Sequence, residues 1–196
     1  MKTYKTTSVD NLQLIARQVQ ECISLAPGSN FFIQDTDYFK KHCPALCDYL
    51  KSINLFDRWS RTGIVKLEAN SVLSLHSDGR CRWALNLPVQ NCSESYTIWY
   101  DAELITDEIK PVVVDGVITE ATYVKYREDT AVEIDRVCAD QPLWVNVQTP
   151  HSAINKSDNP RILITLRFYP ELDDILINST CATKKSNPYK NNLYLR

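Results

Sequence analysis

The chain has 196 residues, with 22 Lys and Arg against 24 Asp and Glu, and so a formal net charge of −2 at pH 7. This length suits one domain with additions and allows a substantial buried core. The charge offers no general basic field to nucleic acid or an anionic membrane, and no stretch approaches the roughly 20 apolar residues of a membrane span.

The cysteines indicate a reducing compartment. Their number is odd, seven, and the first residues, Met1 to Lys5, lead into no apolar segment. We therefore expect free thiols and a cytoplasmic protein. Cys43 and Cys47 beside His42 could form one corner of a zinc site, but no second pair follows at zinc-site spacing. Packing of the two cysteines as small hydrophobic residues is the better interpretation.

Two helices are predicted in the first 54 residues. Residues 8–24 open with the capping residue Ser8 and carry apolar residues at helical spacing, until Pro27 and Gly28 stop the helix. Residues 31–33 form a short strand. A second helix is expected from Asp35 or Thr36 to about Ile53, and Pro44 can split or kink it. We expect these helices to buttress the outer face of a barrel.

From Leu55 the apolar period changes from 3.6 to 2. The candidate strands are 62–68, 71–76, 81–88, 95–101, 131–138, 142–149 and 161–169, with turn signals at Asp78-Gly79, Asn91-Cys92-Ser93, Asp115-Gly116 and Ser157 to Pro160. Seven or eight short strands without long helices between them fit a jelly roll. The predicted fold is therefore mainly β, a double-stranded β-helix (cupin-like) over residues 55–170 with N-terminal buttressing helices over residues 1–54.

Two regions fit this pattern less well. Within residues 102–130, Val112–Val114 and Val117-Ile118 flank Asp115-Gly116 like a hairpin, and Glu120 to Arg127 could be a short helix or an edge strand. Residues 171–196 form a C-terminal tail, in which 171–178 could make a last helical turn or strand. The polar, basic part of the tail, 184–192, is expected to be solvated. Contact with a nucleic acid or a partner is the alternative.

Two of the three histidines occur in motifs that suit a metal. His76 and Asp78 are two residues apart at the end of an apolar run, so on extended backbone their side chains share one face. If sheet pairing brings His151 beside them, the three form a 2-His-1-carboxylate triad, which suits non-heme Fe(II). Arg161, ten residues after His151, would offer a planar fork to a carboxylate.

These residues resemble the 2-oxoglutarate- and Fe(II)-dependent oxygenases, whose motif is His-x-Asp, a long gap, a second His and an Arg about ten residues later. The similarity is greatest to the aspartyl/asparaginyl β-hydroxylase-like branch with its small phage and bacterial members, through Arg82 to Pro88 and His151 to Asn155 with Pro160-Arg161. It covers roughly residues 55–170. It implies Fe(II), 2-oxoglutarate and O2 as cofactor and cosubstrates, with ascorbate as a candidate stimulant, and the host cytoplasm if a phage encodes the chain.

The resemblance also assigns roles to residues. His76, Asp78 and His151 would be the metal ligands and catalytic centre, and Arg161 would bind the far carboxylate of 2-oxoglutarate. Arg167 has the same strand parity and is the competing candidate.

Arg82 and Asn86 are the further candidates for binding the cosubstrate, since positions 82, 84 and 86 share a strand face. The chain departs from the branch in this run, where Ala84 and Asn86 replace the His and Gly of Arg-x-His-Leu-Gly-Leu. It also has Asp78, a carboxylate that the vertebrate β-hydroxylases lack.

The implied reaction is hydroxylation of a C–H bond coupled to the conversion of 2-oxoglutarate to succinate. The substrate would be an Asp, Asn or Pro side chain of a protein or peptide, or a small molecule; a nucleobase or free amino acid is a second enzymatic alternative. A non-catalytic cupin-like metal- or ligand-binding module is the alternative from another class. The low net charge argues against nucleic acid as a partner, but the basic tail keeps nucleic-acid binding as an alternative. Residues 102–130 would be a substrate-choosing lid or a plain surface hairpin.

Four aromatic residues could line the mouth of the barrel or fill its core: Trp83, Trp99, Tyr100 and Trp144. Core packing is the preferred interpretation, because alternating burial explains them without a ligand.

Overall fold

The structure, a computed structural model, describes residues 3–23, 31–78, 82–114, 117–173 and 177. The helices are α1 (Leu12–Ile23), α2 (Thr36–His42) and α3 (Pro44–Ser52), followed by a 3₁₀ turn at Phe56–Arg58. The strands are β1 (Tyr4–Thr6), β2 (Phe31–Gln34), β3 (Trp59–Leu67), β4 (Ser71–His76), β5 (Trp83–Gln90), β6 (Ser95–Asp101), β7 (Leu104–Val114), β8 (Val117–Tyr126), β9 (Val132–Cys138), β10 (Leu143–Asn146), β11 (His151–Asn155) and β12 (Arg161–Phe168).

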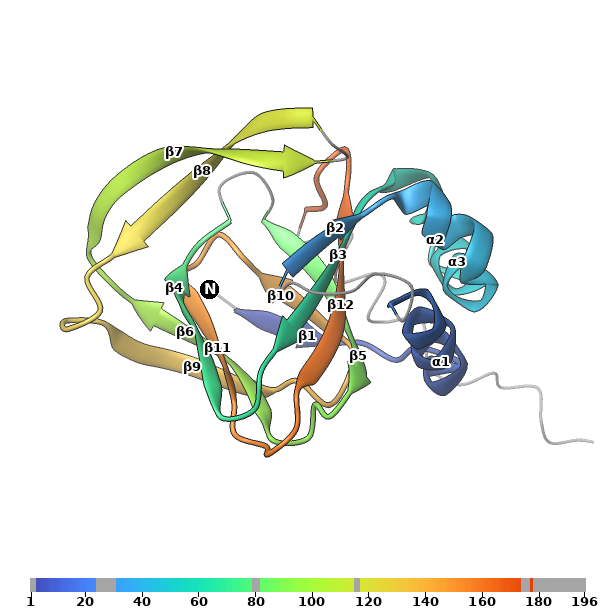
Figure 1. The fold of residues 1–196 in the computed structure, drawn as a ribbon, viewed down its shortest axis with the longest axis horizontal. Coiled ribbons are helices and arrows are strands. Elements are labelled where there is room, and N and C mark those ends of the chain that lie inside the picture. The colour runs from blue at the N-terminus through green and yellow to red at the C-terminus, as the bar shows by residue number, and fades with distance from the viewer. Residues whose placement is uncertain (1–2, 24–30, 79–81, 115–116, 174–176, 178–196) are drawn as a thin grey trace, which may run out of the picture.

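Two antiparallel sheets face each other and enclose the barrel interior (Figure 1). One sheet has six strands in the order β1-β10-β5-β12-β3-β2, and the other has four in the order β4-β11-β6-β9. Along the chain, β3, β4, β5 and β6 alternate between the sheets, and β9 to β12 alternate back in the same way. This strand order is that of a double-stranded β-helix, a form of jelly roll, so the predicted mainly β fold is confirmed.

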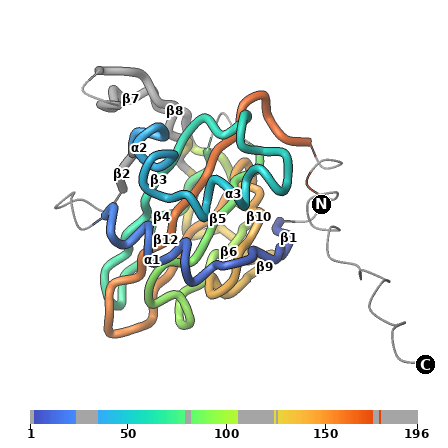
Figure 2. Tube along the Cα trace, turned by 90° about the vertical axis from the view of Figure 1, so that its right-hand side faces the viewer, coloured from blue at the N-terminus to red at the C-terminus, as the bar shows by residue number. Residues whose placement is uncertain are grey.

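The three helices cover the outer face of the six-stranded sheet (Figure 2). Alternate residues of β5 and β12 point outward to them, Leu85 and Leu87 from one strand and Ile164 and Leu166 from the other. All four side chains are buried together with the apolar faces of α1, α2 and α3. The predicted buttress is confirmed, and it fixes the sheet that carries Arg161 and Arg167.

Helix boundaries follow local capping chemistry. α1 begins at Leu12 rather than near Ser8, because the chain turns at Asn11, whose φ is 58° and whose carbonyl accepts the Ile15 N–H at 3.0 Å. The Asp37 N–H donates to the Asp35 side chain at 2.9 Å, so Asp35 caps α2 as predicted. Pro44 splits the second predicted helix into α2 and α3.

The strands between 142 and 155 differ from the prediction. β10 ends at Asn146, because the Asn146 side-chain oxygen accepts the N–H groups of Gln148 and Thr149 and turns the chain. The next strand, β11, then begins at His151. β1 was not predicted either; it extends the six-stranded sheet, and its Tyr4 stacks on Trp99 with ring centroids 5.6 Å apart.

The segment between β6 and β9 is one long hairpin. β7 and β8 pair from Val114 and Val117 down to Leu104 and Tyr126, so the ambiguous stretch after Glu120 is strand rather than helix. The hairpin arches across the end of the barrel where β4 stops (Figure 1). The turn at Asp115-Gly116, the basic tail and most of the 171–178 stretch lie outside the described residues.

Five cysteines within the described residues are free thiols: Cys22, Cys43, Cys47, Cys92 and Cys138. The first three are buried with the apolar helix residues, and the Sγ atoms of Cys22 and Cys43 lie 3.6 Å apart. Burial raises the pKa of all five thiols, which keeps them protonated at neutral pH. Cys43 and Cys47 thus pack as small hydrophobic residues, as predicted. Among the described residues no helix is long and apolar enough to cross a membrane.

Candidate active site

Pairing of β11 with β4 brings His76 and His151 together. The two residues lie opposite each other in the register, and their ring centroids are 4.5 Å apart. His151 is 8% exposed, whereas His76 is half-buried. The juxtaposition expected from the sequence is therefore present at the end of the barrel that the hairpin crosses.

A β-bulge beside these histidines sets the direction of their side chains. His151 pairs with His76, but Ala153, two residues on, pairs with Leu73, three residues back, so β4 holds one extra residue. Because opposite residues of an antiparallel pair share a face, the bulge lets His76 and Leu73 both face the same side as His151 and Ala153.

Both rings have the same hydrogen-bond arrangement. Nδ1 of His76 lies 2.7 Å from the Ser74 carbonyl oxygen, and Nδ1 of His151 lies 2.9 Å from that of Thr149. A carbonyl oxygen can only accept, so each Nδ1 carries a proton, and in the neutral form of the ring Nε2 keeps a lone pair. Backbone carbonyls that hold Nδ1 in this way are the usual support of histidine metal ligands.

Burial favours the neutral form of His151. Desolvation, reinforced by the nearby His76 ring, lowers the pKa of His151 to about 4 despite the opposing charge of Asp78. His151 is thus a neutral nitrogen base at physiological pH, the state in which imidazole binds a metal.

Asp78 lies close to both histidines but pairs with an arginine. Its carboxylate forms an ion pair with the Arg167 guanidinium, and its backbone N–H donates to the Val147 carbonyl at 2.7 Å. Burial alone would raise the pKa of Asp78, but the charge of Arg167, the interactions with the His151 and His76 rings in their protonated form, and the hydrogen bond from Arg167 hold it below its usual value. Among the described residues, no three His, Cys, Asp or Glu side chains are gathered closely enough to hold a metal ion.

Arg161 and Arg167 lie at opposite ends of β12. Arg167 is at the histidine end, whereas Arg161 is six residues away, roughly 20 Å along the strand. Nη1 of Arg161 donates to the Ser95 hydroxyl at 3.1 Å. Ser95 pairs with Asn155, four residues and roughly 13 Å along β11 from His151.

Arg161 is a buried cation without a carboxylate partner among the described residues. It is 1% exposed, and burial lowers its pKa, with Cys92 opposing the effect. The Arg161 Nε atom has no hydrogen-bond partner in the part of the chain that the structure describes. A buried guanidinium without a partner anion is costly, so the site favours an anion that the described part of the chain does not provide.

The barrel interior between Arg161 and the histidines has both apolar and polar side chains. On β6 and β11, Thr97 and Ala153 point inward between the levels of Ser95 and Asn155 and of Trp99 and His151. Leu73 on β4 and Val137 on β9 lie opposite them and face the same side. On the facing sheet Asn86 pairs with Thr165. Within the described structure, three buried polar atoms of the inward-pointing side chains have no hydrogen-bond partner: Asn86 Oδ1, Arg161 Nε and Arg167 Nη1.

The remaining predicted residues have mixed positions. Asn86 is on the inner face of β5, as expected. Arg82 precedes β5, and its backbone N–H donates to the Glu171 side chain at 2.8 Å. The three tryptophans, Trp83, Trp99 and Trp144, are buried, whereas Tyr100 is half-buried on the outer face of β6.

Three residues of the site were not predicted. Ser95 bonds Arg161, Tyr126 lies 2.9 Å from the Ser77 hydroxyl, and Asn155 holds the turn before β12. Asn155 belongs to the second motif and could have been noticed there. Ser95 and Tyr126 are single polar residues in strands, and only the pairing of distant strands gives them a role.

Comparison with known proteins gives similarity at the level of the fold. No protein-family model and no curated protein matches the sequence. A non-heme alpha-ketoglutarate-dependent carbocyclase, SnoK from nogalamycin biosynthesis, is 12% identical over 91% of this chain and 86% of its own, with a TM-score of 0.49. A Pseudomonas putida prolyl-4-hydroxylase is 12% identical over 85% of this chain and 86% of its own, with a TM-score of 0.46.

A third similar structure is oxalate decarboxylase from Bacillus subtilis. It is 13% identical over 73% of this chain, with a TM-score of 0.34, and the chain spans only 26% of that protein. The strand order, and not these weak similarities, defines the fold. None of the three is an aspartyl/asparaginyl hydroxylase, so that finer part of the resemblance stays a prediction.

Proposed function

We propose that the protein is an Fe(II)- and 2-oxoglutarate-dependent dioxygenase. The observation that carries this proposal is the combination, inside one double-stranded β-helix, of the His76–His151 pair with a buried Arg161 that has no carboxylate partner among the described residues. The pair offers two nitrogen ligands and the arginine offers a site for a carboxylate.

The residues present fit a metal with one adjustment. His76 and His151 would bind through Nε2, because Nδ1 of each ring is held by a carbonyl. Asp78 would be the third ligand after its carboxylate shifts toward the histidines, with one oxygen for the metal and the other still paired with Arg167. Its low pKa keeps it ionised for this role. Bound Fe(II) and 2-oxoglutarate would supply oxidation by O2 of an unactivated C–H bond, with release of succinate and CO2.

The two arginines would have different tasks. Arg167 is engaged with Asp78 and would orient that ligand. Arg161 has no such engagement, so it is the better partner for the distal carboxylate of 2-oxoglutarate, supported by the Ser95 hydroxyl. The Asn86 oxygen, which has no partner among the described residues, faces the same interior and would meet donors of the bound ligand or water.

The substrate would approach at the histidine end of the barrel, beneath the β7–β8 hairpin. A side chain of a protein or peptide, or a small molecule, is the proposed class of substrate. The hairpin would exclude water from the reacting centre, which strengthens charge interactions there.

The test is succinate formation from 2-oxoglutarate with anaerobically added Fe(II), then O2 and ascorbate. Wild type is compared with His151→Ala, Arg161→Ala and the control His42→Ala, which changes a histidine on α2 away from the site. We expect turnover to vanish in His151→Ala, to need much more 2-oxoglutarate in Arg161→Ala, and to persist in the control.

A parallel calorimetric titration measures 2-oxoglutarate binding with and without metal. Binding without metal, and without turnover, would instead favour a non-catalytic module that holds a carboxylate at Arg161. No binding in either condition would contradict both functions.

A further inference from the structure

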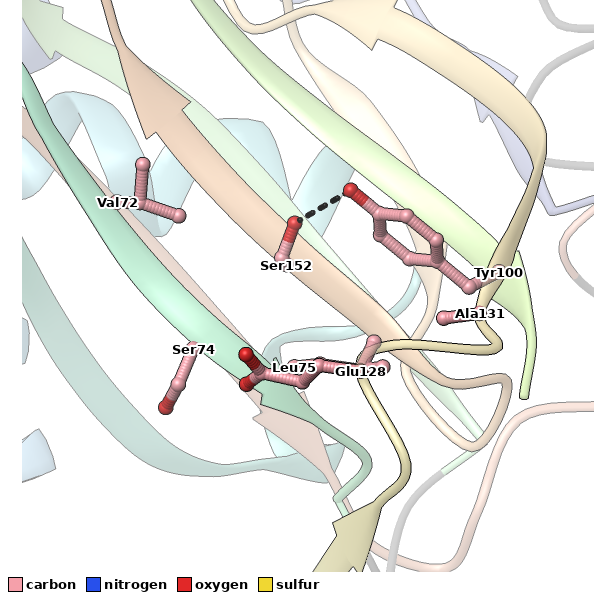
Figure 3. A pocket seen from close by; sticks show the side chains of 7 residues that line it. All are labelled: Val72, Ser74, Leu75, Tyr100, Glu128, Ala131 and Ser152. Carbon is pink, nitrogen blue, oxygen red and sulfur yellow. Dashed lines mark hydrogen bonds between the residues drawn. The ribbon is translucent and has the colours of Figure 1, made fainter. Parts of the chain in front are cut away.

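A second hollow lies on the outer face of the four-stranded sheet (Figure 3). Its volume is about 420 Å³, and its walls come from β4, β6, β11 and the connection between β8 and β9. Ser152 follows His151 directly, and successive strand residues point to opposite faces. The hollow is therefore separated from the proposed metal site by the thickness of the sheet.

The polar groups in this hollow are rich in acceptors. The Glu128 carboxylate forms no ion pair within the described part of the chain, and the Ser74 hydroxyl has no hydrogen-bond partner there. Ser152 donates its hydroxyl to the Tyr100 oxygen at 3.3 Å. Figure 3 shows the Glu128 carboxylate and the Ser152 and Tyr100 hydroxyls around the same opening. Such a set suits a ligand that brings several N–H donors.

The surrounding charge is negative. The acidic residues at the base of the hairpin are Asp101, Glu103, Glu128, Asp129 and Glu133. Arg127 pairs with Glu103 at 3.0 Å and Arg136 with Glu133 at 2.6 Å, which leaves Asp101, Glu128 and Asp129 without a basic partner in the described structure. A cation would be attracted to this region.

The remaining walls are apolar. Val72 is 62% exposed, and Leu75 and Ala131 complete the lining. They would cover a short aliphatic chain, whose burial is favourable.

We propose that this hollow binds an ammonium or guanidinium group carried on a short aliphatic stem, the chemistry of a lysine or arginine side chain, with Glu128 as its counter-ion. The cation would meet the Glu128 carboxylate and the hydroxyls of Ser74, Ser152 and Tyr100, and the stem would lie on Val72 and Leu75. The site stands independently of the proposed oxygenase activity, because it needs neither metal nor 2-oxoglutarate.

The experiment is a titration of the ¹⁵N-labelled full chain, without metal, followed by amide chemical shifts. The probes are n-butylammonium, n-butylguanidinium and the blocked peptide acetyl-Gly-Lys-Gly-amide, with n-butanol as the neutral control. We expect saturable shifts at Leu75, Tyr100 and Ser152 with a cationic probe and none with butanol. Saturation by butylammonium indicates that a small amine suffices, and saturation by the peptide alone indicates a peptide side chain; either supports the site.

Two variants make the test specific. Glu128→Gln should weaken binding at least about tenfold, as expected for loss of a charge-assisted contact. Asp129→Asn removes a neighbouring charge outside the lining and should change affinity by less than about twofold. Equal weakening in both variants, saturable binding of butanol at the same residues, or no saturable binding of any probe would overturn the proposal.

Discussion

The hydroxyl oxygen of Tyr126 lies 2.9 Å from that of Ser77. Ser77 stands between the proposed ligands His76 and Asp78, and Tyr126 is the last residue of β8. One hydrogen bond therefore ties the base of the long hairpin to the segment that would hold the metal.

Tyr126→Phe removes this bond and little else. We expect the free energy of unfolding to fall by about 1 kcal/mol, and amide hydrogen exchange to accelerate in β8 and around Ser77. Hydrogen exchange measured by mass spectrometry checks this. Tyr96→Phe is the matched control, because no hydrogen bond of its hydroxyl is seen among the described residues; equal acceleration in both variants would contradict the assigned role.

Arg167→Met should raise the pKa of Asp78. The guanidinium is the strongest of the charges that hold this carboxyl ionised, and its removal leaves burial opposed only by the two histidines. The measurement is a ¹³C carboxyl titration by NMR. The control is Arg127→Met, which removes an exposed arginine that pairs with Glu103. In this variant the titration midpoint of Asp78 should equal that of the wild type. A rise as large as in Arg167→Met would argue against the assigned ion pair.

His151 should make folding sensitive to mild acid. Its pKa falls from 6.5 to about 4 on folding, so between these values the unfolded chain binds a proton that the folded chain does not. Stability is therefore full above pH 6.5 and falls as the pH drops toward 4, by up to about 3 kcal/mol. Urea unfolding at several pH values measures the slope. His151→Gln should reduce the pH dependence of the free energy of unfolding between pH 4 and 6.5. An unchanged pH dependence would contradict the role assigned to His151.

Arg161→Met should separate stability from ligand binding. Removing a buried, unpaired charge is expected to leave the free energy of unfolding unchanged or higher. The affinity for 2-oxoglutarate should fall by about 100-fold or more, as for loss of one member of a buried charge pair. Thermal unfolding and calorimetry give the two values. A stable variant with unimpaired affinity would transfer the carboxylate site to Arg167.

Asn155→Ala should be strongly destabilising. The side-chain nitrogen donates to the carbonyls of Leu67, Glu68 and Asn159 at 3.2, 3.0 and 2.8 Å, and its oxygen accepts from Ser157. Leaving these buried groups unpaired should cost about 3 kcal/mol. Gln20→Ala, whose side chain is exposed, should cost at most about 0.5 kcal/mol by the same urea titration; similar losses in both would contradict this account.

The sequence predicted the helices and most of the strands, because these depend on periodicity and on short motifs. The pairing of His76 with His151 was a condition of the metal-site hypothesis, since no strand was predicted at 151–155. The sequence did not distinguish Arg161 from Arg167. Both have the same parity on β12, and only the pairing of β12 with its neighbours shows that one meets Asp78 while the other is buried beside Ser95.

Other differences have similar physical causes. β10 ends at Asn146 because the N–H groups of Gln148 and Thr149 donate to the Asn146 side chain and not to a neighbouring strand. β1 has three residues, too few for a period to be visible. In the hairpin, Lys110, Pro111 and Glu120 interrupt the apolar alternation, so its length was underestimated.

The extra residue in β4 reverses the alternation of that strand between Leu73 and His76. Residues before and after the bulge therefore face the barrel interior with opposite parity, although both sets belong to one strand. Deletion of one residue between Leu73 and His76 would give regular pairing with β11 and leave the two residues two apart, both on the face of His151 and Ala153. Related chains that use the same histidine pair should therefore tolerate loss of the bulge, because the pair depends on the register of His76 with His151.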